Sequence, residues 1–155
     1  MLNKSTLLMQ AIDDGSEAIS LGYMLGDEFF PVKKLKLKEG VLSVSSSQNL
    51  QDVSSIASES LYGTFIDCVG ITSVRFPALM NIGKYGLGEA FSGCTGLTGS
   101  VSFPALISVS SGGLYRAFSG CTNLTEVHFP AALSGNSQCT ASNMGCSNAT
   151  VYFDL

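Results

Sequence analysis

The chain has 155 residues, of which 45% are hydrophobic and 13% are charged, and its formal net charge is −4. This length suits one domain with a continuous core, and the high apolar fraction excludes intrinsic disorder. The small number of Lys and Arg residues argues against a nucleic-acid partner, and no apolar run is long enough for a membrane span.

Residues 1–30 read as helical. Ser5 or Thr6 is placed to cap "TLLMQAIDD", and Ser16 is placed to cap "SEAISLGYML". The start of the chain lacks the apolar stretch and the small-residue cleavage site of a secretory signal. We therefore expect cytoplasmic synthesis, which leaves virion association, or surface association by another route, open.

The next segment, "VKKLKLKEGVLSV" at 32–44, alternates polar and apolar residues on both sides of "EG" and predicts a β-hairpin. It holds half of the basic residues of the chain: Lys33, Lys34, Lys36 and Lys38. One interpretation is a solvated face that protects an edge strand from pairing. The other is a docking patch for an acidic partner. Residues 1–49 are thus predicted to form an N-terminal cap of helices and a lysine-rich hairpin.

Residues 50–155 repeat themselves. "AFSGCTGLT" begins at Ala90 and "AFSGCTNLT" begins at Ala117. Within one unit, "TSVRFP" alternates with period two and predicts a short strand, which Pro ends. "GLYRAF" has apolar residues at helical spacing and predicts about one turn of helix. One unit cannot bury its own apolar side chains, whereas stacked units bury them in a continuous core.

A column of cysteines marks the repeat. Cys68, Cys94, Cys121 and Cys146 are separated by 26, 27 and 25 residues. The pattern predicts an α/β repeat protein, a short solenoid of about four coils with parallel strands on one face. We expect the cysteines to be reduced and buried at a corner of the coils, because they form no C-x-x-C pair and no secretory signal precedes them.

These units resemble the BspA-like leucine-rich repeats, whose unit reads roughly C-x-x-L-x-x-I-x-L-P-x-x-L-x-x-I-x-x-x-A-F-x-x-C. The residues that carry the resemblance are "CTNLTEVHFPAALSG" and "LISVSSGGLYRAFSGC", with Phe in place of the second strand Leu. The resemblance covers residues 50–155. It implies a leucine-rich-repeat fold and a use in adhesion or recognition, because members of this family are usually surface or secreted proteins of bacteria, phages and some protists.

Each predicted strand has a Val that points inward, at Val74, Val101, Val127 and Val151. The residues that flank this Val point to solvent, because side chains alternate along a strand. They predict two exposed columns across the stacked strands. The first column is Ser73, Ser100, Glu126 and Thr150, and the second is Arg75, Ser102, His128 and Tyr152. The second column is the stronger candidate for binding, since Arg and Tyr are favoured at interface hot spots.

No pattern of residues predicts catalysis, a metal site or a cofactor. His128 has no Ser or Asp partner fixed by the sequence, and one His is too few for a Cys/His zinc site. We therefore predict a non-catalytic recognition or adhesion module that binds a protein or a glycan on the exposed solenoid face. The alternative is a structural component of a phage or another multiprotein assembly.

Overall fold

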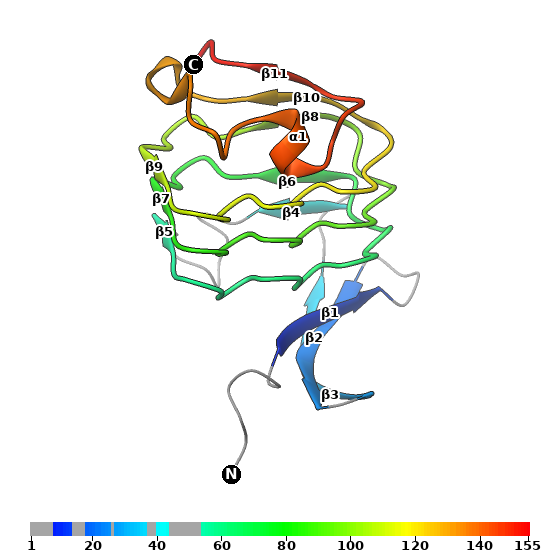
Figure 1. Ribbon diagram of the computed structural model, residues 1–155. Coiled ribbons are helices and arrows are strands. Elements are labelled where there is room, and N and C mark those ends of the chain that lie inside the picture. The colour runs from blue at the N-terminus through cyan, green and yellow to red at the C-terminus, as the bar shows by residue number, and fades with distance from the viewer. Residues whose placement is uncertain (1–7, 14–17, 26, 37–39, 44–53) are drawn as a thin grey trace.

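The computed structural model describes residues 8–13, 18–25, 27–36, 40–43 and 54–155. The chain winds into a β-solenoid of about four turns, with parallel strands and little helix. Figure 1 shows the coils stacked on one another, with a separate N-terminal sheet below them and β11 at the opposite end. The repeat in the sequence therefore corresponds to one coil of the solenoid, as predicted.

One side of the solenoid is lined by β4 and by the four strands that each follow a cysteine of the repeat. They form a two-stranded and a three-stranded parallel sheet, in the orders β4-β6 and β11-β10-β8, and we call the three-stranded one the main sheet. The inward Val is buried in β6, β8 and β10 and half-buried in the last strand, as the period-two pattern predicts. The strand bounds are β4 (Val41–Ser43), β6 (Ser73–Arg75), β8 (Gly99–Ser102), β10 (Leu124–His128) and β11 (Thr150–Tyr152).

A second parallel sheet forms along a neighbouring side, in the order β5-β7-β9. Its strands are β5 (Ser55–Ile56), β7 (Asn81–Ile82) and β9 (Ser108–Val109). The aligned Ile and Val residues of these strands pack against the core. Sequence patterning did not predict this sheet, because strands of two residues are too short to show a period of two.

The third side of each coil is a run of consecutive turns, at 57–68, 83–94 and 110–121, which we call the turn ribbon. Successive N–H groups of the ribbon donate in turn to a carbonyl of the next coil and to a carbonyl of their own coil. The N–H of Phe91 donates to the carbonyl of Ala117 in the next coil at 2.9 Å, whereas the N–H of Ala90 donates to Leu87 in its own coil at 3.1 Å. The ribbon lies in front of β4 and β6 in Figure 1. This ladder of hydrogen bonds between neighbouring coils holds the coils together in the way that strand pairing holds a sheet together.

The helical turn predicted for "GLYRAF" is wrong. Leu114, Ala117 and Phe118 are buried as expected, but the backbone of Arg116 has a φ of 51°, which interrupts any helix. The described residues hold only short helical pieces, η2 (Ala131–Leu133) and α1 (Ala141–Met144). Thr140 caps α1 by accepting a hydrogen bond from the N–H of Asn143 at 3.1 Å.

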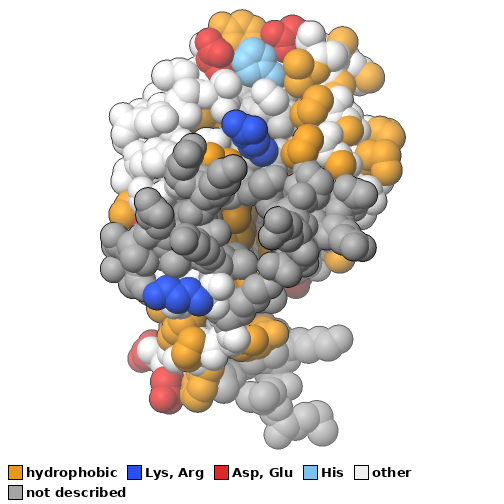
Figure 2. All heavy atoms as spheres, turned by 180° about the vertical axis from the view of Figure 1, so that it is seen from behind, with side chains coloured by type: hydrophobic (Ala, Val, Ile, Leu, Met, Phe, Trp, Pro, Cys, Tyr) orange, Lys and Arg blue, Asp and Glu red, His pale blue; other side chains and the backbone are white. Residues whose placement is uncertain are grey.

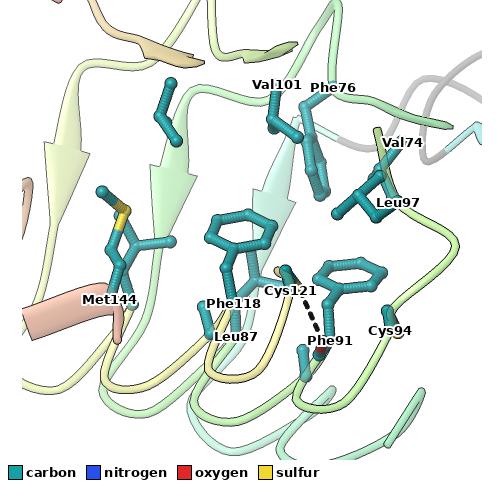
Figure 3. Close-up of a cluster of buried hydrophobic side chains, with 14 of the residues drawn as sticks. Val74, Phe76, Leu87, Phe91, Cys94, Leu97, Val101, Phe118, Cys121 and Met144 are labelled. Carbon is teal, nitrogen blue, oxygen red and sulfur yellow. Dashed lines mark hydrogen bonds between the residues drawn. The ribbon is translucent and has the colours of Figure 1, made fainter. Parts of the chain in front are cut away.

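Stacked phenylalanines fill the core. Phe91 lies between Phe65 and Phe118, with ring centroids 5.3 and 5.7 Å away and nearly parallel planes. A second stack runs through Phe103 and Phe129 at 5.2 Å. Figure 3 shows the rings of Phe91 and Phe118 pointing into the core from adjacent coils. Both residues are fully buried, which makes them central to the core.

All five cysteines are buried and free, as predicted. The thiols of Cys94 and Cys121 each donate to a backbone carbonyl of the preceding coil, and Figure 3 marks the second of these bonds. Each cysteine of the repeat therefore serves as a small apolar residue at the corner that precedes a strand.

The N-terminal region is a three-stranded antiparallel sheet in the order β1-β2-β3, so the predicted helices are wrong. Its strands are β1 (Leu8–Asp13), β2 (Ala18–Leu25) and β3 (Glu28–Lys36). "AISLGYML" includes β-branched, aromatic and glycine residues, and pairing on both edges outweighs its weak helical period. The predicted caps Ser5, Thr6 and Ser16 lie outside the described residues.

The predicted lysine-rich hairpin is also wrong. Strands do form on both sides of "EG", but β3 pairs with β2, whereas β4 pairs in parallel with β6 of the solenoid. β1 joins the sheet to the solenoid. The N–H of Ala11 donates to the carbonyl of Thr64, and the carbonyl of Ala11 accepts from the thiol of Cys68 at 3.7 Å. β1 thereby continues the ladder of the turn ribbon by one further rung.

Candidate functional site

The register of the main sheet assembles most of the two predicted columns. Glu126 lies beside Ser100 and Thr150, and His128 lies beside Ser102 and Tyr152. The flanking side chains are exposed or half-buried, while the valines between them point inward. The face is therefore an ordered, solvent-facing array.

Ser73 and Arg75 lie on β6, which belongs to the other sheet and pairs with β4. β6 lies next to β8, and the N–H of Thr98 donates to the carbonyl of Thr72 at 3.1 Å just before these strands begin. Arg75 is exposed. It extends the column toward the N-terminus, but no described hydrogen bond or ion pair joins it to the His128 end.

His128 is the centre of a compact polar cluster. Its Nδ1 lies 2.9 Å from Oδ1 of Asp154, and its Nε2 lies 3.2 Å from Oε2 of Glu126. Its ring stacks on that of Tyr152, with centroids 4.9 Å apart and 15° between the planes. Figure 2 shows the imidazole between acidic side chains at one end of this face.

These carboxylates favour the protonated imidazole. The hydrogen bond with Asp154 raises the pKa of His128, partial burial opposes it, and the bond with Glu126 adds to the increase. Both carboxylates are about half exposed, at 45% and 52% of their side-chain surface. They keep acceptor positions free for a partner while holding the ring in place.

Carboxylates occupy both nitrogens of the imidazole. Nδ1 faces Asp154 and Nε2 faces Glu126, so in this arrangement neither nitrogen is left free to accept a proton from another group. Within the described residues, no group of three or more His, Cys, Asp or Glu side chains is placed to hold a metal ion. The same part of the chain contains no helix with the length and apolar character of a membrane span.

Asp154 was missed by the sequence reasoning. A signal was available, because side chains alternate beyond β11 and place Asp154 on the same side as Tyr152. The stacking of His128 on Tyr152 was not predicted either, although the two residues belong to one predicted column. Comparison of the chain with protein-family models, curated proteins and solved structures finds no match.

Proposed function

We propose that this chain is a non-catalytic recognition module of the BspA-like leucine-rich-repeat type, which binds a protein or glycan on the face of its main sheet. The observation that supports this most is the His128–Tyr152 stack held between two half-exposed carboxylates. The cluster presents an aromatic edge and acceptor oxygens in a fixed geometry. Fixed groups lose little conformational freedom on binding, which favours affinity.

The rigidity of the scaffold supports the same proposal. Glu126, His128 and Tyr152 stand on strands, and Asp154 lies two residues after the end of β11. The strands are anchored by inward valines and stacked phenylalanines. Sites built on regular elements hold their geometry better than sites on loops. The serines that surround the cluster offer further hydroxyl donors and acceptors to a polar ligand.

A pull-down from the native source and a glycan-binding screen would test this function. The variant Arg75→Ala/His128→Ala/Tyr152→Ala should retain its fold and lose the captured partner. A matched control, Ile107→Ala/Ser108→Ala, changes exposed residues next to or within β9 and should retain the partner. Capture that is equal for the two variants would exclude the main-sheet face as the binding site.

A structural role in a phage or another multiprotein assembly is the second candidate. It is favoured by β3, whose Phe30 and Val32 are 43% and 67% exposed at the open edge of the N-terminal sheet. Exposed apolar side chains on an edge strand are typical of contacts with another chain. Sedimentation of wild type and Phe30→Ser/Val32→Ser, alone and with the native extract, tests this role. If the chain is an assembly component that docks through β3, the variant should sediment as smaller species than the wild type does.

A further inference from the structure

The second parallel sheet ends at an open edge in the middle of the described solenoid. β5, β7 and β9 come from three successive coils and stack in register along one side (Figure 1). The next coil contributes no strand here, because η2 and a turn at 134–135 take the place of one. β9 is therefore paired with β7 on one side only. We call the backbone of residues 107–109 on the other side the β9 edge.

The hydrogen bonds between β7 and β9 show what the β9 edge lacks. The carbonyl of Met80 accepts bonds from the N–H groups of Ile107 and Ser108 at 2.7 and 3.1 Å. The carbonyl of Ile82 likewise accepts a bond from the coil of β9 at 2.9 Å. The carbonyls of Ile107 and Val109 stand at the same two positions one coil later, and the next coil donates no described hydrogen bond to either. Such unpaired groups on an edge strand are a template for a further strand.

The inward side chain of β9 is also left without cover. Val109 is half-buried, whereas Ile56 and Ile82, at the same position of β5 and β7, are only 3% and 1% exposed. Alignment of "FPALISV" with "FPAALSG" places Gly135 at this position of the next coil. A Cβ added to Gly135 would have no other atom within 4 Å, so this part of the next coil is not packed against the core. The apolar neighbour that the repeat provides elsewhere is missing above Val109.

The surface around the β9 edge is apolar and uncharged. Ile107 is 67% exposed and Met80, beside it on the preceding coil, is 38% exposed. No Asp, Glu, Lys or Arg occurs on this side of the three coils, at residues 76–83, 103–110 and 129–138. Lys84 follows the first of these stretches but stands on the turn ribbon, with Nζ 5.9 Å from the centroid of the Tyr85 ring. A charged group that docks at the edge would lose water without gaining a partner of opposite charge, so the surface favours an uncharged segment.

We propose that an uncharged, extended segment of a partner protein adds to the sheet as a strand along the β9 edge. Its N–H groups donate to the carbonyls of Ile107 and Val109, and one of its carbonyls accepts from the N–H of Val109, which points to the same side as the carbonyl of that residue. An apolar side chain of the segment covers Val109. In this mode of recognition the main chain supplies affinity, and pockets for alternate side chains supply specificity.

The size of the edge selects a single segment over a second folded copy of this chain. Three residues of a strand span about 10 Å. A stable interface between two folded proteins buries about 800 Å² on each partner, which an edge of this length does not supply. The β9 edge also lies on a different side of the coils from the His128 cluster. The proposal therefore goes beyond the function proposed for the main-sheet face and does not rest on it.

The test is an NMR titration of the full chain with the blocked heptapeptide ALISVSS, which has the sequence of residues 105–111. We expect it to bind, with shift changes centred on β9 and slower hydrogen exchange of the Val109 N–H. The same peptide with Glu in place of Val should not bind. No binding of the unmodified peptide, or equal binding of the Glu peptide, would overturn the proposal.

Two N-methylated peptides test the main-chain bonds without changing the protein. Methylation at the peptide residue equivalent to Ser110, whose N–H faces the preceding rung, should weaken binding about tenfold. Methylation at the residue equivalent to Val109, whose N–H faces away, should leave the affinity unchanged. Equal affinities of the two methylated peptides would show that the peptide does not add as a strand, and the proposal would be wrong.

Two protein variants locate the peptide. Ile107→Lys places a charge at the β9 edge, which is how natural proteins block strand addition, and should weaken binding about tenfold or more. The melting temperature should be kept, because this side chain is mostly exposed. Val69→Lys makes the same change at another exposed apolar residue and should bind as wild type does. Equal affinity of the two variants, or shift changes centred on the edge strand β11, would overturn the proposal. Self-association of the wild type that Ile107→Lys abolishes would assign the edge to a second copy and would also overturn it.

Discussion

The thiol of Cys121 donates a hydrogen bond to the backbone carbonyl of Phe91, which lies 3.1 Å away in the preceding coil. The equivalent bond of Cys94 ends on Phe65 at the same distance. One side chain thus links two coils at the corner where the turn ribbon leads into the strand. The recurrence of cysteine at intervals of one coil follows from this contact, because cysteine is small and apolar and carries a weak donor.

These thiols should be unreactive in the native protein. Burial raises the pKa of Cys68 and Cys121 from 9.0 to about 12, and only the thiolate is a good nucleophile. We expect iodoacetamide to label neither residue at neutral pH until urea is added, as followed by mass spectrometry of tryptic peptides. Rapid labelling of the folded protein at either cysteine would contradict the observed burial.

The raised pKa of the buried thiols makes the protein less stable in alkaline solution. Above pH 9 the unfolded chain loses thiol protons that the native state keeps until about pH 12. The free energy of unfolding therefore falls as pH rises through this window, and the contribution is fully present below it. Urea titrations of wild type and Cys121→Ser at several pH values measure the effect, which should be smaller in the variant. Parallel curves would show that Cys121 does not contribute.

Truncation of a central phenylalanine should be costly. Phe118→Ala removes a fully buried ring that stacks on Phe91 with only 8° between the planes. Loss of such a ring costs about 3–5 kcal/mol of unfolding free energy, measured by urea denaturation. Phe153→Ala provides the matched control, because that ring lies at the end of the second stack and is only partly buried. A smaller loss for Phe118→Ala than for the control would contradict the assignment of the core.

The solenoid could be predicted from the sequence because its signal is repeated. A Val-x-Phe pair, such as Val101 and Phe103, and a cysteine recur once per coil, so a local ambiguity in one unit is resolved by the others. The N-terminal sheet has no such support. "SEAISLGYML" is compatible with helix or strand by local pattern, and pairing of β2 with strands on both sides decides the outcome.

The candidate site could be predicted only as columns of positions. The register of β10 and β11 follows from the repeat, so His128 and Tyr152 were placed together. The contacts of His128 with Asp154 and of Lys84 with Tyr85 depend on side-chain rotamers, which the repeat does not determine. The edge-to-face contacts of Tyr85 with Tyr62 and Tyr115 were missed because Tyr85 occupies a different column of the repeat from the other two, and the contacts unite them only in space.

Thr64 should tolerate replacement by an apolar residue with a gain in stability. Its side chain is fully buried, and its hydroxyl has no hydrogen-bond partner among the described residues, while Ala90 and Ala117 occupy the same position of the next coils. An unsatisfied buried hydroxyl costs about 1–3 kcal/mol, so Thr64→Val, which keeps the shape, should raise the free energy of unfolding by about 1 kcal/mol. Calorimetry compares it with Thr64→Ser, which keeps the hydroxyl and should not stabilise. A fall in stability for Thr64→Val would mean that the hydroxyl has a partner in solution.

Protonation of His128 should couple the candidate site to pH. The chain has one histidine, so its proton resonance can be followed by NMR without ambiguity. Because the bond with Asp154 is the largest cause of the raised pKa of His128, Asp154→Asn should lower that pKa more than Glu126→Gln does.

A folded-state pKa above the ordinary value of 6.5 means that the stabilisation is complete below pH 6.5 and is lost as pH rises through the folded pKa. We therefore expect the free energy of unfolding of wild type to rise relative to that of Asp154→Asn as pH falls through this window. We expect the affinity for a main-sheet partner to rise over the same pH range. A wild-type pKa at or below 6.5 would show that the two carboxylates do not hold the imidazolium in solution.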